Sequence, residues 1–536
     1  MKRFYIVLLV CSTAISHIIT ARNSDDTEDT GRSYLGIRPE GQIADPKILS
    51  GWRYSQLHAK HKESDECDPS HMFQAVVFGS STTDGASLAR YFSPFGVRRM
   101  RVSENTNTAQ VGDFELLSSF FGVITANAIT NPYLSVISLC PSHTEVGLGL
   151  GYRYALWNNA ENTQQLCFYV TAPIVNVHNK MHFRETVLND GGGRLRGPIS
   201  TGGGSTIDTS QVVATFDTMR EAFDQSTWNF GKITCDHHKM SKTGIADITA
   251  VLEYRWVEHE PCHIESYLGV LIPTGNKVDG KYMFQPIVGH GQSWGIVWGG
   301  NFGLTIWHHE HEDFSIRAEL TNNSMYLFTK AQMRSFDVNG RPWSRYIDVY
   351  LNYAQAQQAA NLGGSAGIYL STPGINVFTQ PVDVTPGLSH TVNSAFVFDF
   401  GCWNAELGYN FYARAAELVT LCRFPNDVAF VDIKGLGQTQ PFQTIAGSID
   451  DDSLVVSSPI PLTMYDRSII AVDDLDLSSA ATPAILSNII YGSLGVQCEK
   501  RGYPVFGNVG VSYEFSDRTK AAPQRWGLWI KGGISF

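Results

Sequence analysis

Apolar and polar residues alternate over most of the chain that follows residue 145. In the segment 146–157 one face of an extended strand would carry only apolar side chains, whereas the other would carry glycines and Arg153. The same period of two recurs in eleven further segments, which are 165–178, 244–257, 262–274, 292–308, 312–328, 342–354, 390–401, 403–418, 485–498, 502–515 and 523–536. The pattern therefore predicts an all-β protein.

These predicted strands are longer than the strands of soluble sheets, which average about five or six residues. Aromatic residues gather near their ends, as Tyr254 and Trp256 do in the segment 244–257. Long strands with one apolar face and aromatic belts are typical of barrels that span a membrane. We therefore predict a transmembrane antiparallel β-barrel.

The connections between these segments alternate in length. Short connections lie at 158–164, 258–261, 309–311, 402 and 499–501. Long connections lie between them, and the longest are 179–243 and 419–484. Outer-membrane barrels have short periplasmic turns and long external loops, so we expect 179–243 and 419–484 to lie outside the cell. Strand direction then requires two more strands, one within 366–380 and a first strand near 72–80. The sequence predicts about 14 strands, within a range of 12–16.

Both ends of the chain indicate export to the cell outer membrane. Residues 1–21 have basic Lys2 and Arg3, an apolar run and a small residue at Ala21, as a signal peptide requires. The last strand ends on Phe536, preceded on the same face by Leu528, Ile530 and Ile534. This ending resembles the C-terminal assembly signal of bacterial outer-membrane proteins. It implies outer-membrane lipids and the outer-membrane assembly machinery as partners.

The region between the signal peptide and the main run of strands, residues 22–145, has little regular alternation apart from 72–80. A barrel of 14 strands encloses a lumen that side chains alone would not fill. We expect residues 22–145 to form an N-terminal periplasmic or plug-like segment, followed by the barrel at 146–536. The alternative, a disordered periplasmic tail over 22–65, stays open.

The predicted inner face of the barrel carries charges of both signs. An Arg or Lys facing lipid at mid-depth would cost about 2–4 kcal/mol, so these residues should face an aqueous or protein-filled interior. They either pair with one another and hold a plug, or act on a passing solute. The candidates facing the lumen are Arg153, Asp247, Glu253, Arg255, Arg317, Glu319, Glu406, Arg414 and Glu514, together with Asp348 and Lys531.

Composition narrows the function classes. The 536 residues are 17% charged and 12% aromatic, and the net charge is −11. No long basic run is present, so we expect no nucleic-acid partner. Beyond the signal peptide no apolar run reaches the length of a membrane-spanning helix. The eight cysteines of the mature chain form no Cys-x-x-Cys pair, and no metal or other cofactor is indicated.

Two kinds of chemistry can be tested against the sequence, a metal site and a serine hydrolase. His308, His309, His311 and their acidic neighbours crowd one predicted turn, where adjacent side chains diverge and a metal site is disfavoured. A serine hydrolase needs a serine, a histidine and an orienting acid or amide. The histidines of the predicted strands, among them His390, stand mostly at strand ends, and no Gly-x-Ser-x-Gly motif occurs. We therefore expect no enzyme activity.

The signal peptide, the strand pattern, the N-terminal segment and Phe536 together resemble the FadL-type outer-membrane transporters. Residues 244–248 (Gly-Ile-Ala-Asp-Ile) and 273–275 (Pro-Thr-Gly) are similar to strand-boundary motifs of the MetA-like outer-membrane proteins of aromatic degradation. The Asn-Pro-Ala element of a FadL hatch is replaced here by Asn131-Pro132-Tyr133. The resemblance implies passage of small, hydrophobic or aromatic solutes. The alternative is a closed structural or adhesive barrel whose external loops bind a surface or partner.

Overall fold

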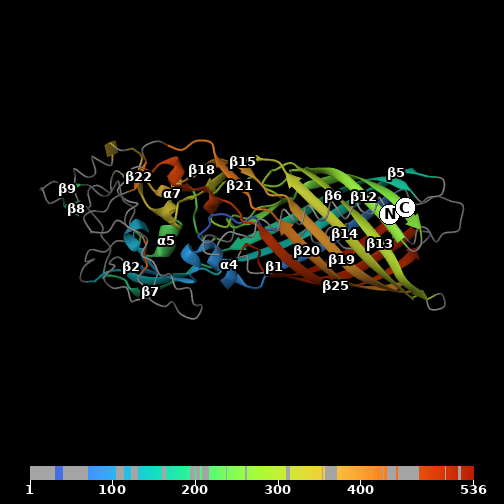
Figure 1. Ribbon diagram of the computed structural model, residues 1–536. Coiled ribbons are helices and arrows are strands. Elements are labelled where there is room, and N and C mark those ends of the chain that lie inside the picture. The colour runs from blue at the N-terminus through green and yellow to red at the C-terminus, as the bar shows by residue number, and fades with distance from the viewer. Residues whose placement is uncertain are drawn as a thin grey trace.

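The computed structural model is a long β-barrel with a large folded region at one end (Figure 1). It describes residues 31–39, 71–103, 114–121, 123, 131–159, 164–192, 199–200, 206–207, 216–236, 238–259, 262–309, 314–352, 354–355, 371–425, 428–430, 442–444, 470–500, 503–516 and 521–536. The predicted signal peptide 1–21 lies outside the described residues.

Twelve antiparallel strands close the barrel. The ring closes where β1 pairs with β27 on one side and with β5 on the other, and β5 continues to β6. The strands are β1 (His71–Thr82), β5 (Ser142–Asn158), β6 (Gln165–Lys180), β11 (Ile248–His259), β12 (Cys262–Ile272), β13 (Gly295–His309), β14 (Phe314–Leu327), β19 (Ser389–Phe400), β20 (Trp403–Arg414), β25 (Ile485–Lys500), β26 (Tyr503–Ser516) and β27 (Arg525–Ser535).

A thirteenth strand, β10 (Ser241–Ile245), continues the line of β11. It pairs with residues 174–178 of β6, whereas β11 pairs with residues 165–171 of the same strand. Asp247 lies in the break between β10 and β11. β10 therefore lengthens one position of the wall and does not add a strand to the ring.

The prediction of 14 strands is wrong by two members. Residues 342–354 form no barrel strand: they contain the short helix η6 (Ser344–Tyr346) and the two-residue strand β17 (Val349–Tyr350). The described part of 366–380 contains the helix α7 (Gly374–Val377) and the start of β18 (Thr379–Thr385). The alternation in 342–354 belongs to buried residues such as Tyr346 and Val349, which pack in a core beyond the barrel. Because 342–354 is not a barrel strand, strand direction no longer requires a further strand within 366–380.

The two faces of the barrel differ in the way the alternation predicts. Large apolar side chains face outward and are exposed, such as Leu268, Leu494 and Ile530 at 61–63%. Tyr, Trp and Phe lie near both ends of the strands on this outer face, for example Trp294 and Tyr326 at one end and Trp307 and Trp403 at the other. Such an outer surface suits a bilayer core with an aromatic belt at each interface.

Connection lengths confirm the predicted asymmetry. At the end of the barrel that carries the C-terminus, strands are joined over 159–164, 260–261, 310–313, 401–402 and 501–502. The opposite end carries the long connections 83–141, 181–247, 273–294, 328–388 and 415–484. We call the described residues of 83–141, 181–240, 328–388 and 415–484 the cap. The described residues of the predicted loop 419–484 belong to it, as do those of 179–243 apart from the ends of that range, which lie in β6 and β10.

The cap has sheets and cores of its own. A five-stranded sheet in the order β23-β3-β2-β4-β7 joins three connections, and a three-stranded sheet in the order β15-β18-β21 joins two. Besides β17, the described strands of the cap, including those of its two-stranded sheets, are β2 (Arg99–Ser103), β3 (Phe114–Leu117), β4 (Leu134–Ser138), β7 (Arg184–Asn189), β8 (Ile199–Ser200), β9 (Thr206–Ile207), β15 (Lys330–Ser335), β16 (Asp337–Val338), β18, β21 (Leu418–Leu421), β22 (Ala429–Phe430), β23 (Phe442–Thr444) and β24 (Leu475–Asp476).

Short helices complete the cap. They are α4 (Gly85–Phe92), α5 (Met219–Phe223), α7 and the 3-10 turns η2 (Pro94–Gly96), η4 (Ser118–Phe121), η6, η10 (Val472–Asp474) and η11 (Leu477–Ala480). The Asp84 carboxylate begins α4 by accepting hydrogen bonds from the amides of Ala86 (3.1 Å) and Ser87 (3.0 Å). Phe223 and Trp343 anchor the larger apolar core. Among the described residues, no helix is both long enough and apolar enough to cross a membrane.

The predicted N-terminal segment 22–145 does not form one unit. Residues 71–82 are the first barrel strand, which confirms the strand predicted near 72–80. Residues 83–141 supply α4 and strands β2, β3 and β4 to the cap. The described residues 31–39 pack against both cap and barrel wall, whereas 22–30 and 40–70 lie outside the described residues. The plug-like role of this segment stays a prediction.

Candidate functional site

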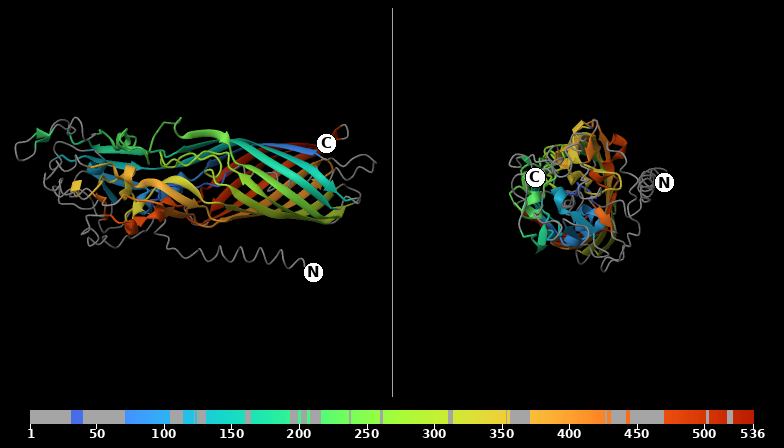
Figure 2. Two further views of the ribbon diagram at one scale, coloured as in Figure 1. Left: turned by 90° about the horizontal axis from the view of Figure 1, so that it is seen from above. Right: turned by 90° about the vertical axis from the view of Figure 1, so that its left-hand side faces the viewer.

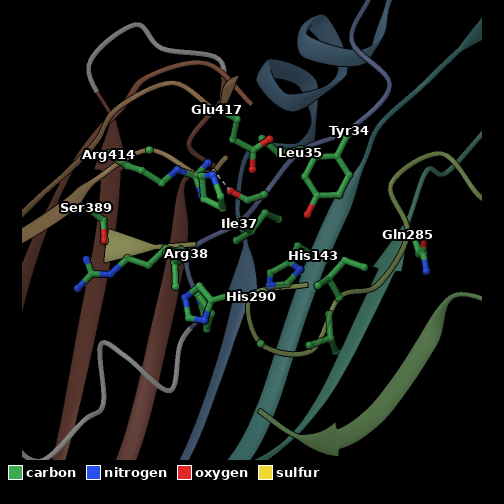
Figure 3. A pocket seen from close by; sticks show the side chains of 18 of the residues that line it. Tyr34, Leu35, Ile37, Arg38, His143, Gln285, His290, Ser389, Arg414 and Glu417 are labelled. Carbon is green, nitrogen blue, oxygen red and sulfur yellow. Dashed lines mark hydrogen bonds between the residues drawn. The ribbon is translucent and has the colours of Figure 1, made fainter. Parts of the chain in front are cut away.

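A cavity of about 60 Å³ lies where the barrel wall meets the cap (Figure 3). Its walls come from four sources: residues 34–39, the connection 273–294, the ends of β5, β6, β14, β19 and β20 nearest the cap, and Gln332, Arg334, Pro386, Gly387 and Glu417 of the connections that follow β14 and β20. In the side view of Figure 2 the barrel and the folded region follow one another along the long axis of the molecule. The cavity therefore sits in the mouth of the barrel, between the lumen and the cap.

Residues 31–39 hold their position by contacts with both the cap and the barrel. At the cap, Arg32 donates to the carbonyl of Ala481 (2.8 Å), and the Gly36 amide donates to Thr482 Oγ1 (2.9 Å). At the barrel wall, Arg38 donates to Asn410 Oδ1 (3.0 Å) and its guanidinium lies 4.4 Å from the ring centre of Tyr412. The segment is thus anchored at both ends of its described length.

Tyr34 lies in the middle of this arrangement. The Arg334 guanidinium stacks on its ring at 3.1 Å, and Arg334 also contacts Glu417 at 3.4 Å. Burial raises the pKa of the Tyr34 hydroxyl above its ordinary value, so the side chain stays neutral at physiological pH. The contact is a cation–π pair that ties residues 31–39 to β15 of the cap.

On the opposite wall, His143 of β5 faces the cavity. Asn179 donates through its amide nitrogen to the carbonyls of Phe284 (3.0 Å) and Gln285 (3.2 Å), so its oxygen points to His143 Nδ1 at 2.7 Å. Nδ1 must therefore carry a proton. The buried Nε2 has no hydrogen-bond partner among the described residues and lies 3.9 Å from Glu145.

Asp247 fixes the third wall, the connection 273–294. Its carboxylate accepts hydrogen bonds from the amides of Thr274 (3.2 Å), Gly275 (3.4 Å) and His290 (2.7 Å), and lies 2.6 Å from His290 Nδ1. The two motifs that resemble the MetA-like proteins, 244–248 and 273–275, therefore meet at one carboxylate. Asp247, predicted to face the lumen, holds a loop in place at the barrel mouth.

Apart from Arg414 and Asp348, the remaining predicted lumen charges are buried, and many of them pair. In one group, Glu253 accepts from Arg153 (3.0 Å). Arg255 donates to Glu265 at 3.2 Å, and Asn301 donates to the same carboxylate at 3.1 Å. These charges are nearly inaccessible to solvent. Close pairing compensates their buried charges.

Two further groups line the same interior. Arg317 contacts Glu319 (3.4 Å) and Asp399 (3.0 Å), and His263 contacts Glu319 (3.3 Å). Glu406 accepts from the Tyr491 hydroxyl (2.9 Å), which in turn accepts from Asn393 (2.9 Å). Glu514 pairs with Arg525, a partner that the sequence pattern missed because Arg525 begins the last strand. Lys531 is also buried, whereas Asp348 was predicted to face the lumen and lies in the cap.

Arg414 differs from these paired charges. It ends β20 at the cavity, and its Nη2 donates to the carbonyl of Gly36 (3.0 Å). Of the nine lumen candidates, Arg414 and Asp247 are the two that line or shape the cavity. The residues that sequence reasoning missed are those of 34–39 and His143, since neither position breaks the alternation or carries a recognisable motif.

The predicted assembly signal lies at the outer surface of the last strand. Leu528 and Ile530 face outward at 42% and 61% exposure, and Phe536 is 49% exposed. Ile534 lies opposite Phe73 of β1 and Val505 of β26. The Phe536 ring stacks on His71, and the two residues exchange backbone hydrogen bonds at 3.0 and 2.8 Å. Recognition by assembly machinery stays a prediction.

Neither candidate chemistry forms a complete site in the described part of the chain. No group of three His, Cys, Asp or Glu side chains could hold a metal there. Ser324 and His390 do face each other on adjacent strands, with Oγ 2.7 Å from Nδ1. Both are buried on the outward face, and the buried Nε2 of His390 has no hydrogen-bond partner there. An orienting acid, which a hydrolytic triad requires, is therefore missing from this pair.

No family model matches the chain, and no curated protein matches it by sequence. Solved outer-membrane β-barrels are similar to it in structure. They include a COG4313 outer membrane channel from Pseudomonas putida F1, at 7% identity over 89% of this chain and 98% of that one, with a TM-score of 0.39. A Pseudomonas aeruginosa FadL homologue is 6% identical over 95% and 96%, with a TM-score of 0.27. The CymD monoaromatic hydrocarbon channel is 8% identical over 94% of each, with a TM-score of 0.25. Identities and scores this low leave the function of this chain to its own residues.

Proposed function

We propose that this protein is an outer-membrane barrel that passes a small solute, and that residues 31–39 close its mouth. The observation that carries the proposal is the position of this segment. It crosses the barrel mouth and contacts Asn410, Tyr412 and Arg414 on one wall. The segment is also held at the cap by Arg32 and Gly36, and Leu35 packs in the larger apolar core. Opening the mouth would therefore break these contacts, but it would leave the strands of the barrel wall paired.

The cavity beside this segment supports a solute with an apolar part. Leu35 and Ile37 face it from the segment, and Val175, Met325 and Leu327 face it from the barrel. Small-molecule sites are commonly apolar pockets with a few placed polar groups. A small hydrophobic or aromatic solute, expected from the sequence, fits this lining.

Gly31 offers a way to displace the segment without touching the lumen. Its φ is +77°, and a Cβ at this position would lie 2.5 Å from Pro342 Cβ. We expect Gly31→Val to push residues 31–39 from their seat, and to raise single-channel conductance of the refolded protein in planar bilayers. Unchanged conductance in a correctly folded variant would count against a closing segment.

Gly340 supplies a matched control. Its φ of +69° is equally unfavourable for a side chain, but an added Cβ would meet nothing within 4 Å. Gly340→Ala therefore adds backbone strain without displacement, and it should leave conductance as in the unaltered protein. An equal rise in both variants would assign the effect to strain in the cap.

A second function is favoured by the cap itself. Four long connections form shared sheets and two apolar cores, which is more structure than loops around a simple pore require. Such a folded surface suits binding of a neighbouring surface or partner. This function corresponds to the alternative expected from the sequence, a closed structural or adhesive barrel. A barrel that stays impermeable after residues 31–39 are displaced would favour this reading.

A further inference from the structure

The outward face of the barrel wall changes from apolar to polar over four successive rows of residues, at the cap end of β5 and β6. Antiparallel pairing places the residues of one row side by side on the same face. In the first two rows, Ile174, Ile245 and Val146 are exposed apolar residues, as expected of a surface that faces lipid. The rows are Leu148, Ile174 and Ile245; Val146, Asn176 and Thr243; Thr144, His178 and Ser241; and Ser142 and Lys180. Because the last two rows are wholly polar, the apolar surface of the wall ends at the second row.

Lys180 lies on this outward face, about 13 Å of strand beyond the row of Val146. Its sequence neighbour Asn179 points the other way and meets His143 at the mouth cavity. At a strand tilt of about 40°, the 13 Å correspond to roughly 10 Å along the membrane normal. Lys180 therefore lies at the level of lipid headgroups when Val146 lies in the hydrocarbon core.

A hollow of about 200 Å³ lies beside Lys180. His182 and Arg184 also line this hollow, and both are exposed. The Ser142 hydroxyl lies 2.9 Å from His182 Nε2 and keeps the ring close to the row of Lys180. Three basic side chains thus converge where β6 ends and the chain continues into β7 of the cap.

The five-stranded sheet of the cap adds a fourth basic side chain. Ser138 of β4 pairs with Arg184 of β7 on one side and with Arg99 of β2 on the other. Side chains of paired residues point to the same face, so Arg99 lies two strands, or about 10 Å, from Arg184. Arg99 is also exposed. We call Lys180, His182, Arg184 and Arg99 the basic patch.

Three cations of the basic patch have no acidic partner. Among the described residues, Lys180, Arg184 and Arg99 form no ion pair and no side-chain hydrogen bond. Arginine and lysine side chains bind phosphate groups well, arginine through two parallel N–H groups and lysine as a point charge. The basic patch is therefore complementary to a phosphorylated ligand.

The nearby carboxylates have partners elsewhere. Asp236 lines the hollow, but it lies 3.7 Å from Lys239 Nζ. Glu185, which follows Arg184 in β7, accepts hydrogen bonds from the amides of Met219 and Arg220, both at 3.2 Å. Its carboxylate thus points to α5 in the cap. Neither acid neutralises the basic patch.

We propose that the basic patch binds a phosphorylated lipid of the outer leaflet, with a phosphate in the hollow between Lys180 and Arg184. The acyl chains lie along the apolar wall, against Val146 and Ile174. The patch begins where the lipid-facing surface ends, which favours a lipid over a free anion, because basic residues beside a membrane-spanning segment bind anionic headgroups. The long connections place the cap end outside the cell, so the lipid belongs to the outer leaflet. This inference does not depend on the passage of a solute.

Calorimetry of the refolded full-length protein in zwitterionic micelles tests the proposal with diphosphoryl lipid A as the probe. Lipid A without its phosphates has the same sugars and acyl chains, and we expect it to bind at least tenfold more weakly. Inorganic phosphate should also bind at least tenfold more weakly, because it gains nothing from the apolar wall. Equal affinity for the two lipids, or no detectable binding of diphosphoryl lipid A, would overturn the proposal. Inorganic phosphate that binds as tightly as lipid A would assign the patch to a free anion and would also overturn it.

Variants then assign the site. Lys180→Gln combined with Arg184→Gln should weaken binding of diphosphoryl lipid A at least tenfold, whereas Lys180→Arg with Arg184→Lys, which keeps both charges, should lose less. Lys330→Gln with Arg423→Gln is the matched control. It removes the same two kinds of charge at another sheet of the cap, since Lys330 begins β15 and Arg423 follows β21. Each variant is first checked for heat-modifiable migration as a folded barrel. Full affinity in the folded Lys180→Gln, Arg184→Gln protein, or an equal loss in the control, would refute the assignment.

Discussion

The buried pair of Arg153 and Glu253 shows how single residues support the barrel interior. Arg153 donates to Glu253 at 3.0 Å and to Gln165 at 3.1 Å, and all three are buried. Removing one charge of such a pair leaves the other without compensation, which typically costs about 3–5 kcal/mol.

Glu253→Gln should therefore lower the free energy of unfolding by about 3–5 kcal/mol, measured by urea unfolding of the refolded barrel. Lys242→Gln is the control: Lys242 is an exposed residue of β10, and its loss should change stability by less than about 0.5 kcal/mol. Similar small losses for both variants would mean that Arg153 finds another partner, and that the pairing is not structural.

Asp348 gives the cap a pH-dependent stability. Burial raises the pKa of this carboxyl to about 6, and its hydrogen-bond partner is the Ser371 hydroxyl at 3.2 Å. The unfolded chain has the lower pKa of 3.8, so between these values the folded state binds more protons. The contribution of Asp348 to cap stability is therefore largest below about pH 4 and is lost as the pH rises through 6.

Asp348→Asn removes this titration. We expect the variant cap to unfold at a higher temperature than the unaltered cap at pH 7.5, and to lose that advantage at pH 4. The measurement is limited proteolysis of the cap against temperature at the two pH values. An advantage that is the same at both pH values would show that Asp348 does not titrate in this range.

At the scale of elements, the last strand connects sequence pattern to membrane position. Ile530 lies opposite Val77 and Val509 near the middle of its strand and is 61% exposed on the outer face. Ile530→Arg should destabilise the barrel in a bilayer by about 2–4 kcal/mol, because it places a charge in lipid near mid-depth. Ile530→Val is the apolar control and should cost much less. A cost below about 1 kcal/mol for the arginine would place this position near an interface.

The alternation predicts barrel strands well because the outer face of each strand suits lipid, whereas the inner face carries polar and charged side chains. Eleven of the twelve barrel strands were expected from apolar residues at every second position, and β1 near 72–80 was expected from strand direction. The same pattern fails at 342–354, where Trp343 has φ +70° in a turn whose amides donate to Asp337. Buried strands and turns of a folded cap satisfy the alternation as well as lipid-facing strands do, so the pattern alone does not separate them.

The candidate site could be predicted only in part, for a related reason. Residues facing the lumen follow from strand parity, and Arg414 and Asp247 were found in this way. Their partners lie far along the chain: Gly36 is 378 residues from Arg414, and His290 is 43 from Asp247. Segments 34–39 and 285–290 have no regular secondary structure, so no period in the sequence places them in the barrel mouth.

At the scale of the whole molecule, three layers follow one another along the barrel axis. Paired charges lie in the interior of the wall, and residues 31–39 and the connection 273–294 meet in the mouth. The cap lies beyond the mouth, at one end of the barrel (Figure 1). The N-terminal segment is held by side-chain and backbone contacts to the cap and the wall, whereas the connection 273–294 is joined to the wall at both its ends.

Liposome swelling tests this account most directly, with the full-length protein compared with a chain that lacks residues 22–70. Both proteins must first show the heat-modifiable migration of a folded barrel. The account predicts that small solutes enter rapidly with the shortened chain and slowly with the full-length protein. Equal swelling by the two proteins, at the rate of protein-free liposomes, would contradict passage through the lumen and favour a sealed barrel that acts through its cap.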